Sequence, residues 1–471
     1  MRGGSPEGAR RRMEIDRPNA ITQNTIWKEL LKYFFPILLG TFFQQLYNIV
    51  DASIVGLVVG EAGLAAVGGN SMTLINLFLG FFVGLGAGAT VVVSQHYGAQ
   101  DAEGTSRAVH TVVAISLAAG AVLTVAGSLL SRLMLEKLMH TPSDVLGPST
   151  MFLQVYFLGI ESVLFFNIGS GILRAVGDSR RPLLYLIIGS IVNIALDLIL
   201  VVWLRMGVMG AALATLTAQT CAAVLLIIRL MRVSDCYRLH LKKIGFDRTV
   251  LRDAFRIGLP SGFQSTMYGI SNVLIQSGVN GFGTQTIAAW AAYSKIDALF
   301  WMTVNAFGIS VTTFVSQNYG ARKMDRVRKS VRTGYLMAML TTLMISLAVY
   351  TFAEPFIKIF TTDAEVIRTG ASLIREITPL YFTYVSIEIL SGALRGMGES
   401  LVPMCMTVVG ICVLRLVWLY AVFPRFGTMS SLVFGYPVTW AATSVMFIIY
   451  YLLVMRGGLP KRLAAGLGGL G

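Results

Sequence analysis

Four polar side chains lie within stretches of the chain that are otherwise apolar, and together they could bind a small cation. They are Asp51, Asn193, Asp197 and Thr215. Asn193 and Asp197 are four residues apart, so a helix would place them on the same face. Two carboxylates, an amide and a hydroxyl offer oxygen ligands that suit Na⁺, and two neighbouring carboxylates can instead share a proton. We therefore predict a site for H⁺ or Na⁺, with no other metal and no cofactor.

The composition indicates that these residues lie in a membrane. Hydrophobic residues make up 55% of the 471 residues, charged residues only 13%, and the mean hydropathy is +0.69. Soluble domains carry about 25% charged residues. The net charge of +14 could suggest nucleic acid as a partner. However, the basic residues lie in connectors between apolar runs and no nucleic-acid-binding motif accompanies them, so we expect the lipid bilayer as the partner.

Twelve apolar runs are long enough to cross a bilayer, which needs about 20 residues. They fall near 33–57, 63–93, 107–131, 150–173, 183–204, 209–231, 253–278, 285–315, 333–353, 372–394, 403–423 and 430–455. Lys and Arg concentrate in the connectors after the even-numbered runs, which favours two cytoplasmic termini in a plasma or inner membrane. The predicted organisation is a disordered leader (1–28, where Met1 or Met13 is the natural start), a six-helix lobe (29–231), a basic connector (232–252), a second six-helix lobe (253–455) and a tail (456–471).

Hydrogen bonding between helices is the alternative role for polar residues inside a membrane. Two carboxylates are a costly way to join helices, because each costs about 3 kcal/mol or more unless it is hydrated, paired or protonated. Thr215 could also bond its own helix backbone. The chain turns near Met206, nine residues after Asp197 and nine before Thr215. Those two residues should therefore lie at one depth, with Asp51 nearby.

Two passages recur at almost constant spacing, which indicates that the chain is an internal duplication. The run VSQHYGA at 93–99 returns as VSQNYGA at 315–321, and SGILRAVGDSRRP at 170–182 returns as SGALRGMGESLVP at 391–403. Each unit holds six spans, an even number, so the two repeats are parallel and related by an axis along the membrane normal. The acids do not repeat, because Val273, Leu414 and Trp418 occupy the corresponding positions.

Other polar residues at membrane depth are candidates for a substrate cavity between the halves. They are Gln44, Asn48, Asn167, Gln264 and Glu388. Pro36 lies fifteen residues before Asp51 and is a candidate for bending the first helix, because proline removes a helical hydrogen bond. The sequence leaves open the roles of four further charged residues, Glu161, Lys295, Asp297 and Arg415.

Three motifs resemble those of the multidrug and toxic compound extrusion (MATE) family. They are YNIVD at 47–51, the paired VSQxYGA segments and the paired SGxLRxxG[D/E]SxxP segments, and the resemblance spans about residues 28 to 455. It implies a twelve-helix, two-lobed antiporter that exports organic, often cationic and amphipathic compounds in exchange for inward H⁺ or Na⁺. The family's first-lobe cation site maps onto Asp51, Asn193, Asp197 and Thr215, and its bending first helix onto Pro36. The second-lobe carboxylates of some Na⁺-coupled members are not matched in span 7, which has Gln264 and no acid.

Two other functions are less well supported by the residues. A flippase for lipid-linked saccharides is expected to have a more cationic cavity and often fourteen spans. An intramembrane enzyme would need a metal or nucleophile constellation. The four histidines form no HExxH motif, and no GxSxG motif is present. We therefore predict an all-α integral membrane exporter of small organic molecules that functions as a monomer.

Overall fold

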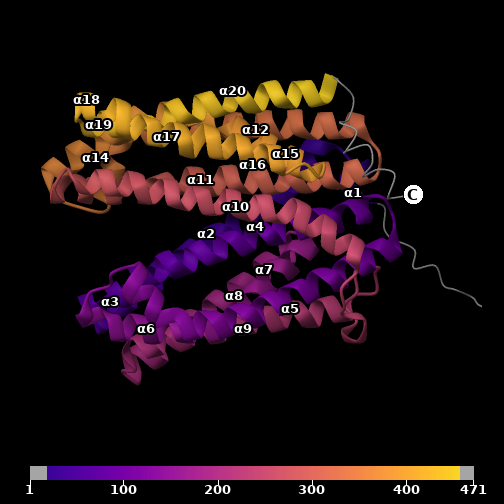
Figure 1. The fold of residues 1–471 in the computed structure, drawn as a ribbon, viewed down its shortest axis with the longest axis horizontal. Coiled ribbons are helices and arrows are strands. Elements are labelled where there is room, and N and C mark those ends of the chain that lie inside the picture. The colour runs from indigo at the N-terminus through magenta and orange to yellow at the C-terminus, as the bar shows by residue number, and fades with distance from the viewer. Residues whose placement is uncertain (1–18, 457–471) are drawn as a thin grey trace, which may run out of the picture.

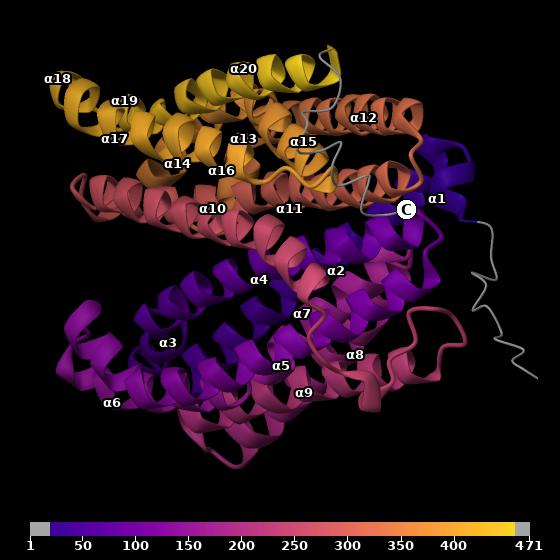
Figure 2. The same ribbon diagram turned by 45° about the vertical axis from the view of Figure 1, so that its right-hand side comes forward.

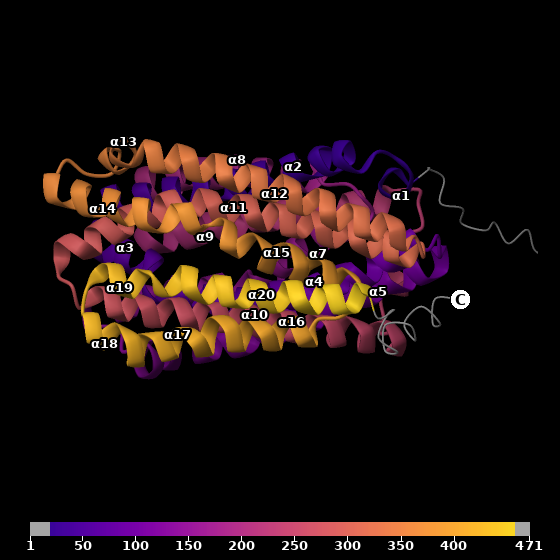
Figure 3. The same ribbon diagram turned by 90° about the horizontal axis from the view of Figure 1, so that it is seen from above.

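The computed structural model describes residues 19–456, apart from the side chains of residues 61 and 62. Within this range the secondary structure is helical throughout. The helices run along the long axis of the molecule, with α1 at one end and α13, α14 and α18 at the other (Figures 1 and 3). Residues 1–18 and 457–471 of the predicted leader and tail, including both candidate start residues, lie outside the described residues.

The first half, which we call the first lobe, contains six membrane-crossing elements. They are α2 (Ile26–Val58), α3 and α4 (Glu61–Gly68, Asn70–Gly98), α5 with the π-helix η1 (Ala102–Leu133, Met134–Leu138), α6 and α7 (Ser143–Leu158, Ile160–Ala175), α8 with the π-helix η2 (Arg180–Asp197, Leu198–Trp203) and α9 (Gly207–Arg232).

The second lobe repeats this order. Its elements are α10 (Arg248–Asn280), α11 (Thr284–Gly320), α12 with α13 (Met324–Thr351, Ala353–Lys358), α14, η4 and α15 (Ala364–Ile377, Thr378–Leu380, Phe382–Gly396), the segment α16, η5, α17, η6 and α18 (Leu401–Thr407, Val408–Val413, Leu414–Val417, Trp418–Val422, Phe423–Phe426), and α19 with α20 (Met429–Val433, Gly435–Arg456).

Hydropathy and geometry support this count of spans and the duplication. Among the described residues, eight helices are long and apolar enough to cross a membrane, and the number is ten if each of two bent pairs is one span. The remaining two, α2 and α10, are 33 residues long each and open the two lobes. The bent pairs, α6–α7 at 48° and α14–α15 at 51°, occupy the same position in each lobe.

The predicted leader needs correction, because residues 19–28 are folded. A short helix α1 (Ala20–Gln23) precedes α2, and the Asn19 side chain accepts a hydrogen bond from the Ile21 amide at 3.1 Å. Two cations of the second lobe hold this helix: Arg326 Nη2 lies 2.9 Å from the Ile21 carbonyl and Lys323 Nζ lies 3.0 Å from the Thr22 carbonyl. Hydrogen bonds from the second lobe and the burial of Ile21 therefore order this short segment. The predicted connector is likewise shorter, since only residues 233–247 separate α9 from α10.

The ribbons of the two lobes diverge toward the end where α3, α6, α14 and α18 lie, and they meet at the end where α1 lies (Figures 1 and 2). Helices α4 and α10 cross at two glycine pairs, where a Cβ on Gly84 would lie 2.6 Å from the Gly262 backbone and a Cβ on Gly88 would overlap Gly258. Each helix carries these glycines four residues apart, the spacing that lets membrane helices approach closely. This spacing was a sequence signal for the contact that the motif analysis missed.

The two duplicated motifs contact each other across the lobes. Gln95 of the first VSQxYGA motif donates from Nε2 to the Gly396 carbonyl at 2.9 Å, and Gln317 of the second donates to the Ala175 carbonyl at 2.6 Å. The two glutamines are repeat counterparts, and so are the two carbonyls. Each lobe therefore closes on the other with the same bond, and we call this reciprocal pair the glutamine latch. It shows why both motifs occur twice.

The connector between the lobes contains a cysteine that should be unreactive. Burial, followed by the neighbouring Asp235 carboxylate, raises the pKa of the Cys236 thiol to about 12, and the residue is only 2% exposed. Because the thiolate is the reactive form, maleimide at pH 8 should label Cys236 about 1,000-fold more slowly than an exposed cysteine. The measurement needs a variant in which the other cysteines are replaced by serine, at positions 221, 405 and 412.

The matched control for this labelling is Ser234→Cys in a background that lacks Cys236, since Ser234 is exposed two residues away. Labelling of Cys236 should accelerate about tenfold for each pH unit, as long as the protein stays folded. Equal labelling rates at the two positions at pH 8 would show that the connector does not bury this thiol.

Candidate cation site

The predicted cation site lies on three packed helices of the first lobe. Asp51 comes from α2, Asn193 and Asp197 from α8, and Thr215 from α9, and α8 packs against both of the others. The carboxyl groups of Asp51 and Asp197 lie close enough to interact electrostatically with each other. Asn193 and Asp197 are buried, with 1% and 0% of their surface exposed. The structure therefore brings together the two acids that are 146 positions apart in the sequence.

The polar atoms of this site are buried without partners. Among the described residues, nothing hydrogen-bonds one oxygen of Asp51, either carboxylate oxygen of Asp197 or either amide atom of Asn193. An unsatisfied buried polar group costs about 1–3 kcal/mol, and more if it is charged. Most buried polar groups in proteins are satisfied, so such a concentration is characteristic of a ligand or proton site. The donor set of two carboxylates and one amide fits Na⁺ or a shared proton.

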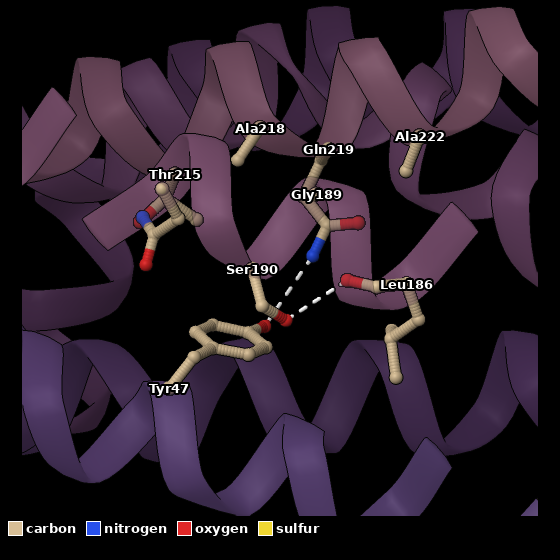
Figure 4. A pocket seen from close by; sticks show the side chains of 9 residues that line it. Tyr47, Leu186, Gly189, Ser190, Thr215, Ala218, Gln219 and Ala222 are labelled. Carbon is tan, nitrogen blue, oxygen red and sulfur yellow. Dashed lines mark hydrogen bonds between the residues drawn. The ribbon is translucent and has the colours of Figure 1, made fainter. Parts of the chain in front are cut away.

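Thr215 and Asn193 also line a small cavity between α2, α8 and α9 (Figure 4). Tyr47 closes one side of it, and its hydroxyl accepts a hydrogen bond from Gln219 Nε2 at 3.4 Å. The free space is enough for about one water molecule. The cavity has polar atoms from three helices, so it can hold one water molecule or one small ion without its hydration shell.

Asp197 occupies a special backbone position, because it is the last residue of α8 before the π-helix η2. A π-turn widens the helix and is frequent at functional sites. The repeat counterpart of Asp197 is Trp418, the first residue of the π-helix η6. The irregular backbone is thus present in both lobes, whereas the carboxylate is present only in the first.

The predicted cavity residues do not form one cluster. Asn167 donates to the Val163 carbonyl of its own helix at 2.9 Å, and Gln264 is buried and donates to Thr407 Oγ1 at 2.9 Å. Gln44 is exposed on α2 and Asn48 is half-buried one turn later, where it lies 3.4 Å from Gln45. In this conformation Gln264 joins two helices, Asn167 is half-buried and bonds within its own helix, and Gln44 is the exposed member of the α2 pair. Their roles in binding a substrate stay predictions.

The fifth cavity candidate, Glu388, sits on α15 beside aromatic hydroxyls. Its carboxylate lies 3.3 Å from the Tyr384 hydroxyl and packs against the backbone of Gly308 on α11. The repeat counterpart of Glu388 is Asn167, so both lobes have a polar residue at this position. Pro36 is buried within α2, which is continuous from Ile26 to Val58.

An aromatic cluster in the second lobe, which was not predicted from the sequence, surrounds a half-buried carboxylate. Asp297 accepts hydrogen bonds from the Tyr381 hydroxyl at 2.5 Å and from Trp301 Nε1 at 2.7 Å. Tyr381 stacks on Phe300 with ring centroids 4.1 Å apart. Asp297 is therefore satisfied, unlike the acids of the first lobe, and Lys295 two residues earlier is exposed. Aromatic residues at membrane depth were visible in the sequence, but the contact spans 84 positions.

The structure shows the contacts of two further charged residues, Arg415 and Glu161, whose roles the sequence left open. Arg415 lies 4.2 Å from the centroid of the Tyr436 ring and donates to Ser271 Oγ at 2.9 Å, so the cation is held by polar groups and a ring face. Glu161 on α7 packs against Gly120 of α5, and its Oε1 is buried with no partner among the described residues. Arg415 thus joins helices, while Glu161 is a further unsatisfied acid of the first lobe.

The fold and the site together define a two-lobed, all-helical membrane transporter. The family model described as MatE matches the chain twice, over residues 36–199 and again over 260–421. The chain therefore belongs to the MatE family, and the double match confirms the internal duplication that the sequence predicted.

Known proteins resemble this chain over nearly its whole length. The Probable multidrug resistance protein YoeA of Bacillus subtilis (strain 168) is 24% identical over 94% of this chain and 98% of its own. The Probable multidrug resistance protein YpnP of the same strain is 24% identical over 91% of this chain and 96% of its own. A solved structure described as the outward-facing conformation of a multidrug resistance MATE family transporter superposes with a TM-score of 0.86, at 22% identity and over 96% and 99% of the two chains.

Proposed function

We propose that this protein is a secondary antiporter that exports organic, cationic and amphipathic compounds in exchange for inward H⁺ or Na⁺. The observation that carries the proposal is the burial of neighbouring Asp51 and Asp197 oxygens without hydrogen-bond partners, beside the unsatisfied amide of Asn193. Two carboxylates in contact repel each other unless a proton or a cation lies between them. The site therefore holds one cation at a time and loses its stability when empty, which is the property that ion coupling needs.

The shape of the molecule supports alternating access. At the α1 end the lobes are joined by the glutamine latch and by stacking of Phe34 on Phe307, with ring centroids 4.0 Å apart. At the opposite end the ribbons diverge (Figure 2). The distribution of basic residues predicts that the α1 end faces the cytoplasm. In that orientation the present conformation faces outward, and the inward-facing one requires the latch to open.

A transport cycle follows from these parts. An ion from outside binds between Asp51 and Asp197, which removes the repulsion between α2 and α8. The new arrangement of α2 changes the surface that α2 presents to the substrate, through the accessible residues Gln44 and Asn48, and the drug leaves outward. The latch then opens, the lobes rock about their glycine-rich contacts, and the ion and the next drug exchange on the cytoplasmic side. The pseudo-symmetric lobes supply the motion, and the acids of the first lobe supply the coupling.

Efflux from proteoliposomes tests this function. The purified full chain is reconstituted with a fluorescent organic cation inside, and an inward H⁺ gradient or an inward Na⁺ gradient is imposed in separate experiments. We expect one of the two gradients to accelerate efflux of the dye, and protein-free vesicles to show no effect of either. Efflux that neither gradient changes would contradict ion-coupled export, and translocation of a lipid-linked saccharide in the same vesicles would indicate the flippase alternative.

A further inference from the structure

A second polar site lies at the α1 end, away from the cation site. It is a recess of about 630 Å³ formed by α1, the first turns of α2, the turn between α7 and α8, and the end of α9. The cationic residues that line it are Lys32, Arg180, Arg181, Arg229 and Arg232, and the acidic ones are Glu29, Asp178 and Asp235. We call this the arginine recess. Its excess of positive charge makes it unsuitable for a cationic substrate of the transporter.

The acids of the recess are already engaged by local partners. Glu29 binds Lys32 at 2.9 Å, and Asp178 binds Arg181 at 2.5 Å. Asp235 accepts a hydrogen bond from the Cys236 amide at 2.6 Å. These pairs neutralise two of the five cations and leave three arginines to consider.

The remaining arginines have no acidic partner. Among the described residues, no carboxylate oxygen lies within 4.0 Å of Arg180, Arg229 or Arg232, whereas eight other cation–carboxylate contacts meet that criterion. Arg229 in addition has its Nε buried with no hydrogen-bond partner. A buried guanidinium donor without an acceptor is unfavourable, so an acceptor brought by a bound anion would stabilise this position.

Comparison of the two repeats shows whether Arg180 and Arg181 are needed to form the α7–α8 turn. The α7–α8 turn and its counterpart share the pattern SGxLRxxG[D/E]SxxP, and the residues that match Arg180 and Arg181 are Leu401 and Val402. The turn therefore forms without any arginine at these two positions. Positive charge near a membrane surface also follows from topology alone, but topology does not require three arginines around one recess.

We propose that the arginine recess binds a phosphate-bearing anion, either the headgroup of an anionic phospholipid or a soluble phosphate compound. Guanidinium groups match phosphate oxygens in geometry and charge. The recess lies at one end of the membrane-crossing helices, where phospholipid headgroups are found, and basic pockets between helices at that level bind such headgroups.

Binding there should favour closure of the α1 end. One wall of the recess is α1, which Arg326 of the second lobe holds, and another wall carries Arg229 of the first lobe. An anion between these walls links the two lobes through α1. The ligand would thus stabilise the conformation in which the glutamine latch is closed.

Thermal unfolding of the purified full chain in a neutral detergent tests the proposal. The melting temperature is measured with phosphatidylglycerol, with phosphatidylcholine at the same mole fraction, and with inorganic phosphate at constant ionic strength. We expect a rise of about 4 °C with phosphatidylglycerol or with inorganic phosphate, and none with phosphatidylcholine. A rise with phosphatidylglycerol alone identifies the headgroup as the ligand, and a rise with inorganic phosphate identifies a soluble one.

The variant Arg229→Gln/Arg232→Gln should lose this rise, while Arg252→Gln should keep it. Arg252 is a control because its side chain is 75% exposed outside the recess. Its substitution removes one arginine charge, as does each of the two substitutions in the double variant and the single variant Arg180→Gln. An equal rise in the double variant, or an equal loss in Arg252→Gln, would overturn the proposal, as would the absence of any rise. If the double variant does not fold, Arg180→Gln and native mass spectrometry of retained phosphatidylglycerol give the same comparison. No transport is measured, so this result is independent of the proposed function.

Discussion

Asp197→Asn is expected to reduce gradient-driven efflux in proteoliposomes by about 10- to 100-fold. This is the factor by which coupled sites typically change each other's affinity. The substitution keeps the volume of the side chain and removes the charge that holds the cation against Asp51. Asp51→Asn should have the same effect for the same reason. Both variants should melt at or above the wild-type temperature, because each removes one of two buried carboxylates that repel each other in the empty site.

Asp297→Asn is the matched control for this substitution. It makes the same chemical change to a half-buried carboxylate of the second lobe, but Asp297 already has Tyr381 and Trp301 as donors. We therefore expect a lower melting temperature and retained dependence of efflux on the ion gradient. Wild-type efflux by Asp197→Asn, with the wild-type response to each gradient, would remove the first-lobe site from the mechanism.

Gly98→Leu is expected to abolish transport by preventing closure of the lobes at the α1 end. A Cβ on Gly98 would overlap the backbone of Gln317, and a Cβ on its counterpart Gly320 would overlap the backbone of Gln95. Overlap with a backbone cannot be relieved by a rotamer change, and overpacking of this kind costs about 1–3 kcal/mol. That cost falls only on the conformation in which the latch is closed, so the equilibrium shifts about 5- to 150-fold toward the opposite one.

The shift can be measured by the distance between spin labels at Met206→Cys and Gly281→Cys, in a background without the four native cysteines. Both positions are exposed in turns at the end opposite α1. The distance should shorten in Gly98→Leu and stay at the wild-type value in Gly147→Leu. Gly147 is the control because a Cβ there has open space around it. An unchanged distance and normal efflux in Gly98→Leu would mean that closure of the lobes does not need this contact.

The sequence by itself determined the membrane class, the duplication and the depth of the polar residues. These properties depend on local chemistry: hydropathy decides which runs enter the bilayer, and the constant rise of a helix places Asp197 and Thr215 level on either side of one turn. Asn193 and Thr215 line one small cavity, as the hairpin of α8 and α9 led us to expect. That Asp51, Asn193, Asp197 and Thr215 together bind a cation stays a prediction. The absence of acids in the repeat was likewise readable from the aligned motifs.

Only the tertiary structure decided which polar residues are satisfied. Asp197 and Asp297 look equivalent in the sequence, yet one is buried without a hydrogen bond and the other is held by a tyrosine and a tryptophan. The hydrogen-bond partners of Gln95 and Gln317 were likewise not readable from the sequence, because they lie 301 and 142 positions away. The rotation of each membrane helix about its axis is set by packing against its neighbours, since lipid accepts any apolar face. Local sequence therefore specifies the helices and their depth, and the assembled bundle specifies their partners.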